Sequence, residues 1–598
     1  MTYFEQPTRQ PAKPILDITY YIMIAVLLFA ILSPVISSIL LLFYNLKIEP
    51  GLNTLLNNTP IINFFDLSVG DGSYYKYYPV FDDIISYTLC SSSFIASMLA
   101  YVYYLHDSNN NESEIHIAGR QLINNESKAA TLFKKNMKKE IEHDLQGLPL
   151  IQTPDNQQLN ISQDRETRNT LIIGGVGGGK TTIMRNYIEQ AIKRKDKCLI
   201  LDNKSDFTKT LNTDFILIAP WDCRGAAWDI AKDIETRSDA TEFAAAIIEE
   251  SKEKFWSDSS RAILEAMIVR AQKENPKKWD FGYLVEILKS GNEEIKKTVE
   301  IYTPEYSSFV SDIESKTTQS ILMTLISNFK NLMILSDAYT RCETSEKFSF
   351  KNWLLNDADN RTVIIQGDRR FEQLQKSLTQ AIFKYISNLI SSPMVTDIAR
   401  KDERRLQLFC DEFPQFGKID GFESLLETGR SKGVRITIGA QDISQLIKIY
   451  SKETVQTWLS LCGTYIICRI NGYETADYFS KTFGKRRVKQ YQSSFSNQIN
   501  QPGTRTDQWI EHELDVVRQD EFGRLNVNKK GVQALVYTAD EYIYKIRAKH
   551  LTAQQKSEKR QASQPARWTQ PGWPAAEDII KANEKANKTE FNSALDAI

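Results

Sequence analysis

The sequence predicts an α/β fold in which helices flank a mostly parallel sheet, with an all-α insertion domain and two preceding transmembrane helices. Short apolar segments typical of buried strands alternate with amphipathic helical segments. A glycine-rich loop stands between one such strand and its helix. Helical periodicity from Trp221 to about Asp337 interrupts this alternation. This helical stretch is too long to be a single crossover connection between two parallel strands.

The glycine-rich loop fits G-x-x-x-x-G-K-[ST], a pattern that binds nucleotide phosphates. The apolar residues 171–173 predict a strand entering the loop, and residues 182–194 predict a helix leaving it. Backbone N–H groups and the helix N-terminus then converge on the phosphates, whereas the alternative is an ordinary glycine turn. The predicted nucleotide-binding residues are Gly174, Gly175, Val176, Gly177, Gly178, Gly179, Lys180, Thr181 and Thr182.

An acidic pair, Asp411 and Glu412, closes a later apolar strand. We expect Asp411 to hold Mg²⁺ together with the hydroxyl of Thr181. Glu412 would polarise the attacking water, and Lys180 would neutralise charge between the β- and γ-phosphates of ATP. The alternative for the pair is a solvated strand end.

Two further side chains have possible roles in this chemistry. Gln441 directly follows the next strand, where a polar side chain can reach the γ-phosphate; it can equally be a turn residue before a helix. Arg430 lies in a surface loop. It is either a solvated arginine or an arginine finger for the nucleotide of a neighbouring subunit, which requires a ring.

The N-terminal region predicts a membrane anchor. Residues 18–44 are apolar and uncharged, and residues 84–105 form a second candidate span, with tyrosines near the ends of both. A cleaved signal peptide and a buried helical hairpin are the less favoured alternatives. Basic residues follow the second span, and ATP is cytoplasmic. We therefore expect both termini inside and the short loop outside.

The composition limits the classes of function. Lys plus Arg total 74 against 75 for Asp plus Glu, so nucleic-acid contact must come from a local patch or a pore. The seven cysteines are scattered without a C-x-x-C pair, and the histidines number five. These counts argue against a disulfide framework and a zinc site, and they fit a reducing compartment.

The chain of 598 residues is long enough for several domains. A Gln-, Asn- and Ser-rich stretch at about 490–508 predicts a polar loop. The predicted domains are a membrane anchor at 1–107, a first nucleotide-binding part at 108–221, an all-α domain at 222–345, a second nucleotide-binding part at 346–550 and a flexible tail at 551–598.

Together these features resemble the conjugative coupling proteins of type IV secretion systems, TraD-type ATPases of the FtsK/HerA-like group. Their order and spacing carry the resemblance, since no single motif is specific. Besides the glycine-rich loop, the matching stretches are Asp202–Phe207, Pro220–Asp229, Asp411–Phe413, Glu427–Arg430 and Gly439–Gln441.

The resemblance implies an inner-membrane hexamer with a RecA-like ATPase domain that uses ATP and Mg²⁺. It would deliver relaxase-bound single-stranded DNA, or protein substrates, to a type IV secretion channel. Its implied partners are non-specific DNA, single- or double-stranded, the relaxosome, the channel components and the membrane. By position, Arg430 falls on the arginine finger of the family and Gln441 on its sensor glutamine.

Two other functions remain open from the sequence. An FtsK-like chromosomal DNA translocase would be favoured by more spans and a C-terminal winged helix, and the sequence suggests neither. A non-catalytic membrane receptor for secreted proteins would not need the complete set of Lys180, Thr181, Asp411 and Glu412.

Overall fold

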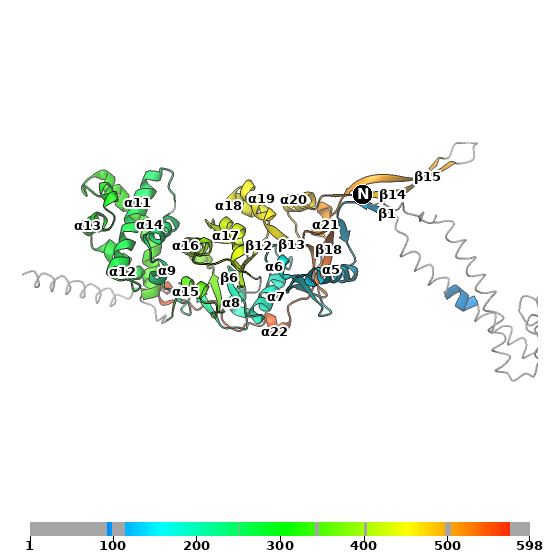
Figure 1. Cartoon of the computed structure of the whole chain (residues 1–598), viewed down its shortest axis with the longest axis horizontal. Helices are drawn as coiled ribbons and strands as arrows, with labels where there is room; N and C mark the ends of the chain where they lie inside the picture. Colours follow the sequence, from blue (N-terminus) through cyan, green and yellow to red (C-terminus); the bar gives the residue numbers. More distant parts are fainter. Residues whose placement is uncertain are drawn as a thin grey trace, which may run out of the picture. The chain divides into compact units, whose positions relative to one another are not determined.

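The chain forms two compact units (Figure 1). The small unit comprises residues up to 118 and residues 486–514, and the large unit comprises residues 119–485 and 515 onward. The structure, a computed structural model, describes residues 93–98, 114–248, 250–340, 346–399, 404–496 and 504–573.

The predicted membrane spans lie outside the described residues, apart from a short helical stretch at 93–98 within the second span. Within the described ranges, no helix has the length and apolar character needed to cross a membrane.

The small unit contains a three-stranded sheet with the order β1-β14-β15, formed by β1 (Glu114–Ala118), β14 (Lys485–Ser496) and β15 (Thr504–Asp515). Glu114 of β1 forms an ion pair with Arg486 and accepts a hydrogen bond from Gln490 Nε2 at 3.1 Å. The polar loop expected at 490–508 is therefore wrong for its described residues, which continue the two strands. β14 pairs with β1 through residues 487–490 and has β15 as its other neighbour, and local composition cannot reveal this strand pairing.

The large unit contains an 11-stranded sheet in its described residues. Its order is β2-β18-β17-β13-β5-β12-β11-β6-β10-β7, with β16 paired to β17. All strands from β13 to β7 are parallel, and β17 joins β13 in antiparallel orientation. The predicted mostly parallel α/β sheet is thus confirmed. The strands are β2 (Gln121–Ile123), β5 (Asn169–Ile173), β6 (Lys197–Asp202), β7 (Phe215–Ile218), β10 (Thr362–Gln366), β11 (Leu406–Cys410), β12 (Val434–Ala440), β13 (Cys462–Ile467), β16 (Val527–Asn528), β17 (Gly531–Tyr537) and β18 (Tyr542–Ala548).

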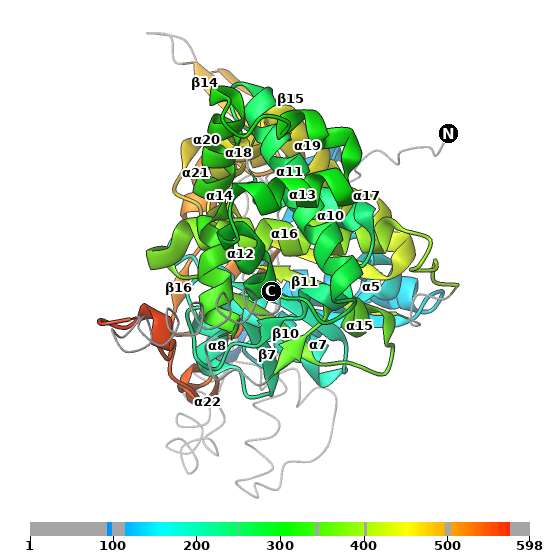
Figure 2. The same ribbon diagram turned by 90° about the vertical axis from the view of Figure 1, so that its left-hand side faces the viewer.

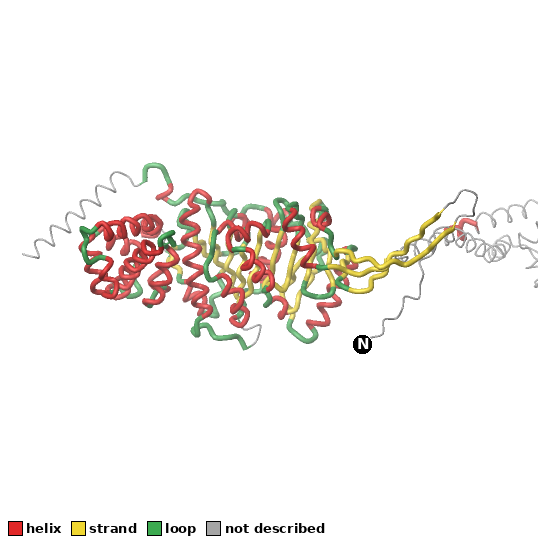
Figure 3. The backbone as a smooth tube through the Cα atoms, turned by 90° about the horizontal axis from the view of Figure 1, so that it is seen from above, coloured by secondary structure: helices red, strands yellow, loops and turns green. Residues whose placement is uncertain are grey.

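Helices cover both faces of this sheet (Figure 3). Two views place α16 and α17 on one side and α7 and α8 on the other (Figures 1 and 2). The helices around the sheet are α5 (Glu126–Ile141), α6 (Gln163–Glu166), α7 (Lys180–Lys193), α8 (Asp206–Thr210), α15 (Phe350–Leu355), α16 (Glu372–Ser391), α17 (Phe422–Thr428), α18 (Ile443–Tyr450), α19 (Lys452–Ser460), α20 (Tyr473–Phe483) and α21 (Gln519–Gly523). A hairpin of β3 (Gln146–Gln152) and β4 (Gln158–Ser162) packs against α5, α6 and α7.

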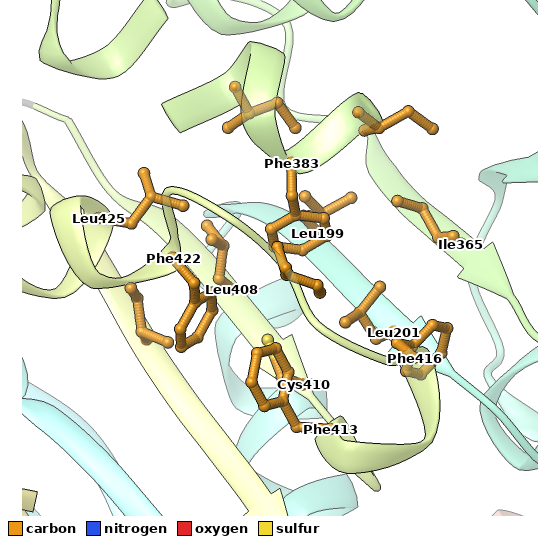
Figure 4. Packing of buried hydrophobic residues seen from close by; sticks show 14 of the residues in the cluster. Leu199, Leu201, Ile365, Phe383, Leu408, Cys410, Phe413, Phe416, Phe422 and Leu425 are labelled. Atoms are coloured by element: carbon orange, nitrogen blue, oxygen red, sulfur yellow. The ribbon is translucent and has the colours of Figure 1, made fainter. Parts of the chain in front are cut away.

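Alternation along β11 shows how the sheet forms two cores. Leu408 and Cys410 face α16 and α17, whereas Phe409 points to the other face and packs edge-on against Tyr187 of α7, with ring centroids 5.6 Å apart. The 3₁₀ turn η4 (Phe413–Phe416) joins the first core. The labelled side chains there are Leu199 and Leu201 of β6, Ile365 of β10, Leu408 and Cys410 of β11, Phe383 of α16, Phe413 and Phe416 of η4, and Phe422 and Leu425 of α17 (Figure 4).

The predicted helical insertion is confirmed between β7 and β10. Its entry and exit are joined by two short parallel strands, β8 (Ala227–Trp228) and β9 (Lys347–Phe348). Asp233 fastens this junction, because its buried carboxylate accepts hydrogen bonds from Trp228 Nε1 at 2.7 Å and Ser349 Oγ at 2.5 Å. Burial raises the pKa of Asp233 to about 6. The helices of this region are α9 (Ile230–Asp233), α10 (Arg237–Ile247), α11 (Lys254–Glu274), α12 (Phe281–Lys289), α13 (Asn292–Tyr302) and α14 (Lys316–Thr340).

Residues 551–573, here called the C-terminal strap, pack on the rest of the large unit. Trp568 donates from its indole to the carbonyl of Pro220 at 2.7 Å, and its ring lies 4.9 Å from that of Phe371. The expected flexible tail is therefore wrong for these residues. They bond to main-chain carbonyls that are distant in sequence, and Trp568 packs on Phe371, which stacks on Trp221. Main-chain hydrogen bonds join Lys559 and Arg560 to Lys209, Cys223 to Gln564, and Ala566 to Trp221.

Replacing Trp568 by Ala should lower the free energy of unfolding by about 2 kcal/mol, because a half-buried indole loses its ring contact and its hydrogen bond. Circular dichroism during thermal unfolding would measure the loss. Tyr473→Ala, at an aromatic position on α20 that is 71% exposed, is the matched control and should change little. Equal effects of the two substitutions would contradict a holding role for the strap.

Candidate active site

The glycine-rich loop runs from the end of β5 to the start of α7, between the carboxyl ends of two neighbouring strands. The Gly174 N–H donates to the carbonyl of Ala440, which ends β12, at 3.2 Å. The Gly175 N–H donates to the carbonyl of Arg469, which follows β13, at 2.9 Å. Val176 at the tip is exposed. The loop therefore has the strand–loop–helix context that the sequence predicts, with α7 presenting its N-terminus to the loop.

Two glycines of the loop have backbone conformations that L-residues rarely adopt. Gly177 has φ of +68° and Gly179 has φ of +97°. A Cβ at Gly177 would meet only ordinary contact with Arg469, whereas a Cβ at Gly179 would overlap the side chain of Val532 on β17. The loop thus depends on its backbone shape, and on close packing at Gly179.

A buried cluster of charged side chains lies at the start of α7. Lys180 forms an ion pair with Asp411, and its Nζ is 3.2 Å from Glu412 Oε1. Gln441 Nε2 donates to the same Oε1 at 2.8 Å. The structure therefore brings together four of the predicted site residues, from the ends of the two strands β11 and β12 and from the start of α7.

Burial and pairing act in opposite directions on the two carboxylates. Burial raises the pKa of Asp411 above its ordinary value, even though Lys180 opposes this shift. Burial alone would also raise the pKa of Glu412, but Lys180, Lys204 and Gln441 together hold it below its ordinary value. Glu412 is therefore a carboxylate at neutral pH.

Glu412 combines an unusual backbone conformation with a buried oxygen that lacks a donor among the described residues. Glu412 has φ of +50°, in the left-handed region, which is uncommon for a residue with a side chain and often marks a functional position. Its Oε2 is buried and accepts no hydrogen bond from any residue that the structure describes. A buried acceptor without a donor costs free energy, so this oxygen fits a ligand or water that is part of the function.

Residues without a role in the sequence prediction also meet here. Lys204 Nζ lies 2.8 Å from Glu412 Oε1. Arg469 reaches the loop, with one guanidinium nitrogen 3.4 Å from the carbonyl of Gly177. The signal for Arg469 was present, because it follows β13 as Gln441 follows β12. Lys204 lies in the Asp202–Phe207 stretch that carried the resemblance.

Arg430 is separate from this cluster. It lies in η5 (Gly429–Lys432), before the amino end of β12, and its guanidinium is 2.9 Å from Asp164 Oδ1. The seven residues of β12 span roughly 23 Å at 3.3 Å per residue. The glycine-rich loop borders the opposite end of that strand, so Arg430 cannot reach the site of its own chain.

The donor set fits one kind of metal site. Among the described residues, no group of three or more His, Cys, Asp or Glu side chains could enclose a metal ion. Thr181 in the first turn of α7 and Asp411 instead fit Mg²⁺, which binds one or two protein oxygens and completes its shell with phosphate and water.

Comparison with known proteins agrees with this geometry. Residues 156–542, well over half of the chain, match the family described as "Type IV secretion-system coupling protein DNA-binding domain". The chain belongs to this family. The resemblance drawn from the motifs is thereby confirmed.

Curated relatives of this coupling protein include Coupling protein TraD of Escherichia coli (strain K12), 24% identical over 410 residues, which cover 67% of this chain and 54% of TraD. Protein VirD4 of Agrobacterium fabrum (strain C58 / ATCC 33970) is 28% identical over 116 residues, 19% of this chain and 17% of VirD4. The chain thus matches about half the length of TraD and a smaller part of VirD4.

Solved structures of similar fold include the bacterial conjugative coupling protein TrwBdeltaN70, with a TM-score of 0.58 and 19% identity over 75% of this chain and 96% of TrwBdeltaN70. TrwB in complex with ADP and Mg²⁺ has the same TM-score and 18% identity, over 75% of this chain and 97% of TrwB. At this identity the comparison establishes the fold.

Replacing Gly179 by Ala should destabilise the coupling protein by about 3 kcal/mol, since it combines an unfavourable φ with an overlap against Val532. Gly177→Ala is the matched control in the same loop and should cost only about 1 kcal/mol, because it has the unfavourable φ without the overlap. Thermal unfolding of both variants would measure the difference. Equal losses would show that packing against Val532 is unimportant.

Proposed function

We propose that this coupling protein binds ATP with Mg²⁺ and hydrolyses it. The observation that carries the proposal is the buried cluster of Lys180, Asp411 and Glu412 beside the glycine-rich loop, in which one oxygen of Glu412 has no donor among the described residues. The loop geometry and the TrwB complex with ADP and Mg²⁺ also support it.

Each side chain then has a defined task. Backbone N–H groups of the loop and the first turn of α7 hold the phosphates. Thr181 and Asp411 hold Mg²⁺, which neutralises charge on the phosphate oxygens when bound. Lys180 exchanges its carboxylate partners for the phosphates. Glu412 accepts a proton from the attacking water at Oε2, and Gln441 links the end of β12 to Glu412.

We also infer that the active form is a homo-hexamer. Arg430 is half exposed and too far from the loop of its own chain, so as an arginine finger it would complete the site of a neighbouring subunit. In this arrangement the RecA-like domain of one chain supplies the loop, and the next chain supplies the arginine. A separate monomer would then hydrolyse ATP poorly.

The proposed cellular task is delivery of conjugative DNA, as a relaxase-bound single strand, or of protein substrates, into a type IV secretion channel. The family description and the names of TraD and TrwB support it. We place the protein in the bacterial inner membrane, anchored by residues 18–44 and 84–105, with its ATPase domain in the cytoplasm. Its partners would be the relaxosome, the channel components and non-specifically bound DNA.

Lys180→Ala should abolish ATP hydrolysis, with or without single-stranded DNA, because the site then lacks the ammonium group that neutralises charge between the β- and γ-phosphates. Steady-state phosphate release from purified protein would measure it. Lys193→Ala, at the exposed end of the same helix, is the control and should hydrolyse normally. Normal hydrolysis by Lys180→Ala would overturn the proposal.

Arg430→Ala should bind ATP but hydrolyse it poorly, as should Glu412→Gln. A mixture of the two should recover part of the activity, because some interfaces then combine an intact Glu412 with an intact Arg430. Asp164→Ala removes the same ion pair but keeps the arginine, so it should remain active. The trans role is wrong if no mixing ratio restores turnover, or if Asp164→Ala is equally impaired.

A further inference from the structure

Lys204 lies at the rim of the candidate site, on the turn that follows β6. Strands β6 and β11 are adjacent and parallel, with Leu201 opposite Cys410, so the residues after them share one edge of the sheet. The Lys204 side chain is 41% exposed, and its Nζ reaches Glu412 Oε1 at 2.8 Å. A solvent-facing cation is thus directed onto a buried carboxylate.

The turn that carries Lys204 is held on both sides. Before it, the Asn203 side chain is hydrogen-bonded to Gln415 of η4 and accepts from Gln375 Nε2 of α16 at 3.2 Å. After it, Ser205 has φ of +58°, and the chain returns as α8. The Asp202 carboxylate accepts main-chain N–H groups of α8 at 2.9 and 2.7 Å. The position of Lys204 is therefore determined by the fold.

The donors to Glu412 are distributed unevenly. Lys180, Lys204 and Gln441 all approach Oε1, at 3.2, 2.8 and 2.8 Å. Oε2 receives no donor from the described residues. This arrangement fixes the rotation of the carboxylate and leaves one oxygen for water.

We propose that Lys204 is a positioning residue, which holds Glu412 in place when Lys180 engages the phosphates. The inference rests on the proposed hydrolysis of ATP. The single ammonium group of Lys180 cannot remain on the acidic pair and also neutralise the phosphates. Lys204 is then the cation that stays on Oε1, while the neutral Gln441 adds a hydrogen bond.

Three substitutions test this role in the full-length protein. Lys204→Met removes the charge and keeps most of the side-chain length, and Lys204→Arg restores a cation. Lys209→Met is the matched control, because Lys209 lies on α8 and its nearest carboxylate oxygens are 3.7 Å away, on Asp206 and Glu558. The measurements are kcat, KM, equilibrium affinity for a fluorescent non-hydrolysable ATP analogue, and melting temperature without nucleotide.

Lys204→Met should lower kcat about tenfold or more, since a misplaced base loses its alignment with the water. Its affinity for the analogue should change less than about threefold, because Lys204 acts through Glu412 and not through the phosphates. Lys204→Arg should recover part of kcat, and Lys209→Met should behave as wild type.

An unchanged kcat in Lys204→Met, beside an active wild type, would overturn the positioning role and leave the proposed hydrolysis intact. A loss of analogue affinity as large as the loss of kcat would also overturn it, because Lys204 would then bind phosphate directly. A wild type that binds the analogue without hydrolysing ATP would instead show that the proposed function itself fails.

Discussion

The burial of Lys180 against Asp411 and Glu412 is the constraint around which the sheet is built. The strands that carry the loop and the acidic pair are not neighbours, because β12 lies between β5 and β11. The groups can meet across β12 because residue 439 is a glycine. A Cβ there would lie 3.2 Å from Asp411 Oδ1 and 2.7 Å from the Met184 side chain. A buried ion pair gives little net stability, so the cluster is better explained by chemistry than by folding.

The carboxyl ends of the parallel strands explain which parts of the site could be predicted. Every strand in such a sheet ends at the same edge, so a polar residue directly after an apolar strand is placed there by sequence position alone. Asp411 and Gln441 satisfy that rule, and Glu412 follows Asp411. Lys180 was found instead from the glycine-loop pattern. Lys204 was harder to assign, because no motif marks it and the turn at Ser205 is what directs it toward β11.

Elements that depend on distant partners were predicted least well. The residues around 490–508 read as a polar loop because their composition is polar. The strand β14 nevertheless continues into them, and its first residues, 487–490, pair with β1, which is far away in sequence. The C-terminal strap reads as a flexible tail because its composition is polar. Many of its contacts are with main-chain carbonyls, which every residue has, and Trp568 packs on Phe371, whose proximity depends on tertiary structure. Periodicity reports which faces are apolar, and it contains no information on such contacts.

Two buried glutamates show how a structural carboxylate differs from one available for chemistry. Glu166 lies in α6 with Arg194 and Arg435 beside it, and Glu412 lies with Lys180 and Lys204. Both are desolvated, and cations hold the pKa of each below its ordinary value, so burial and pKa do not distinguish them.

Hydrogen bonding does distinguish them. Both oxygens of Glu166 accept hydrogen bonds, Oε1 from Gln407 at 2.9 Å and Oε2 from the main chain of Leu148 at 2.8 Å. Glu412 has all its described donors on one oxygen. A fold that satisfies one buried glutamate completely could satisfy the other, and removing a donor from a buried acceptor costs about 1–3 kcal/mol. That cost is accounted for if the free oxygen of Glu412 is where water binds.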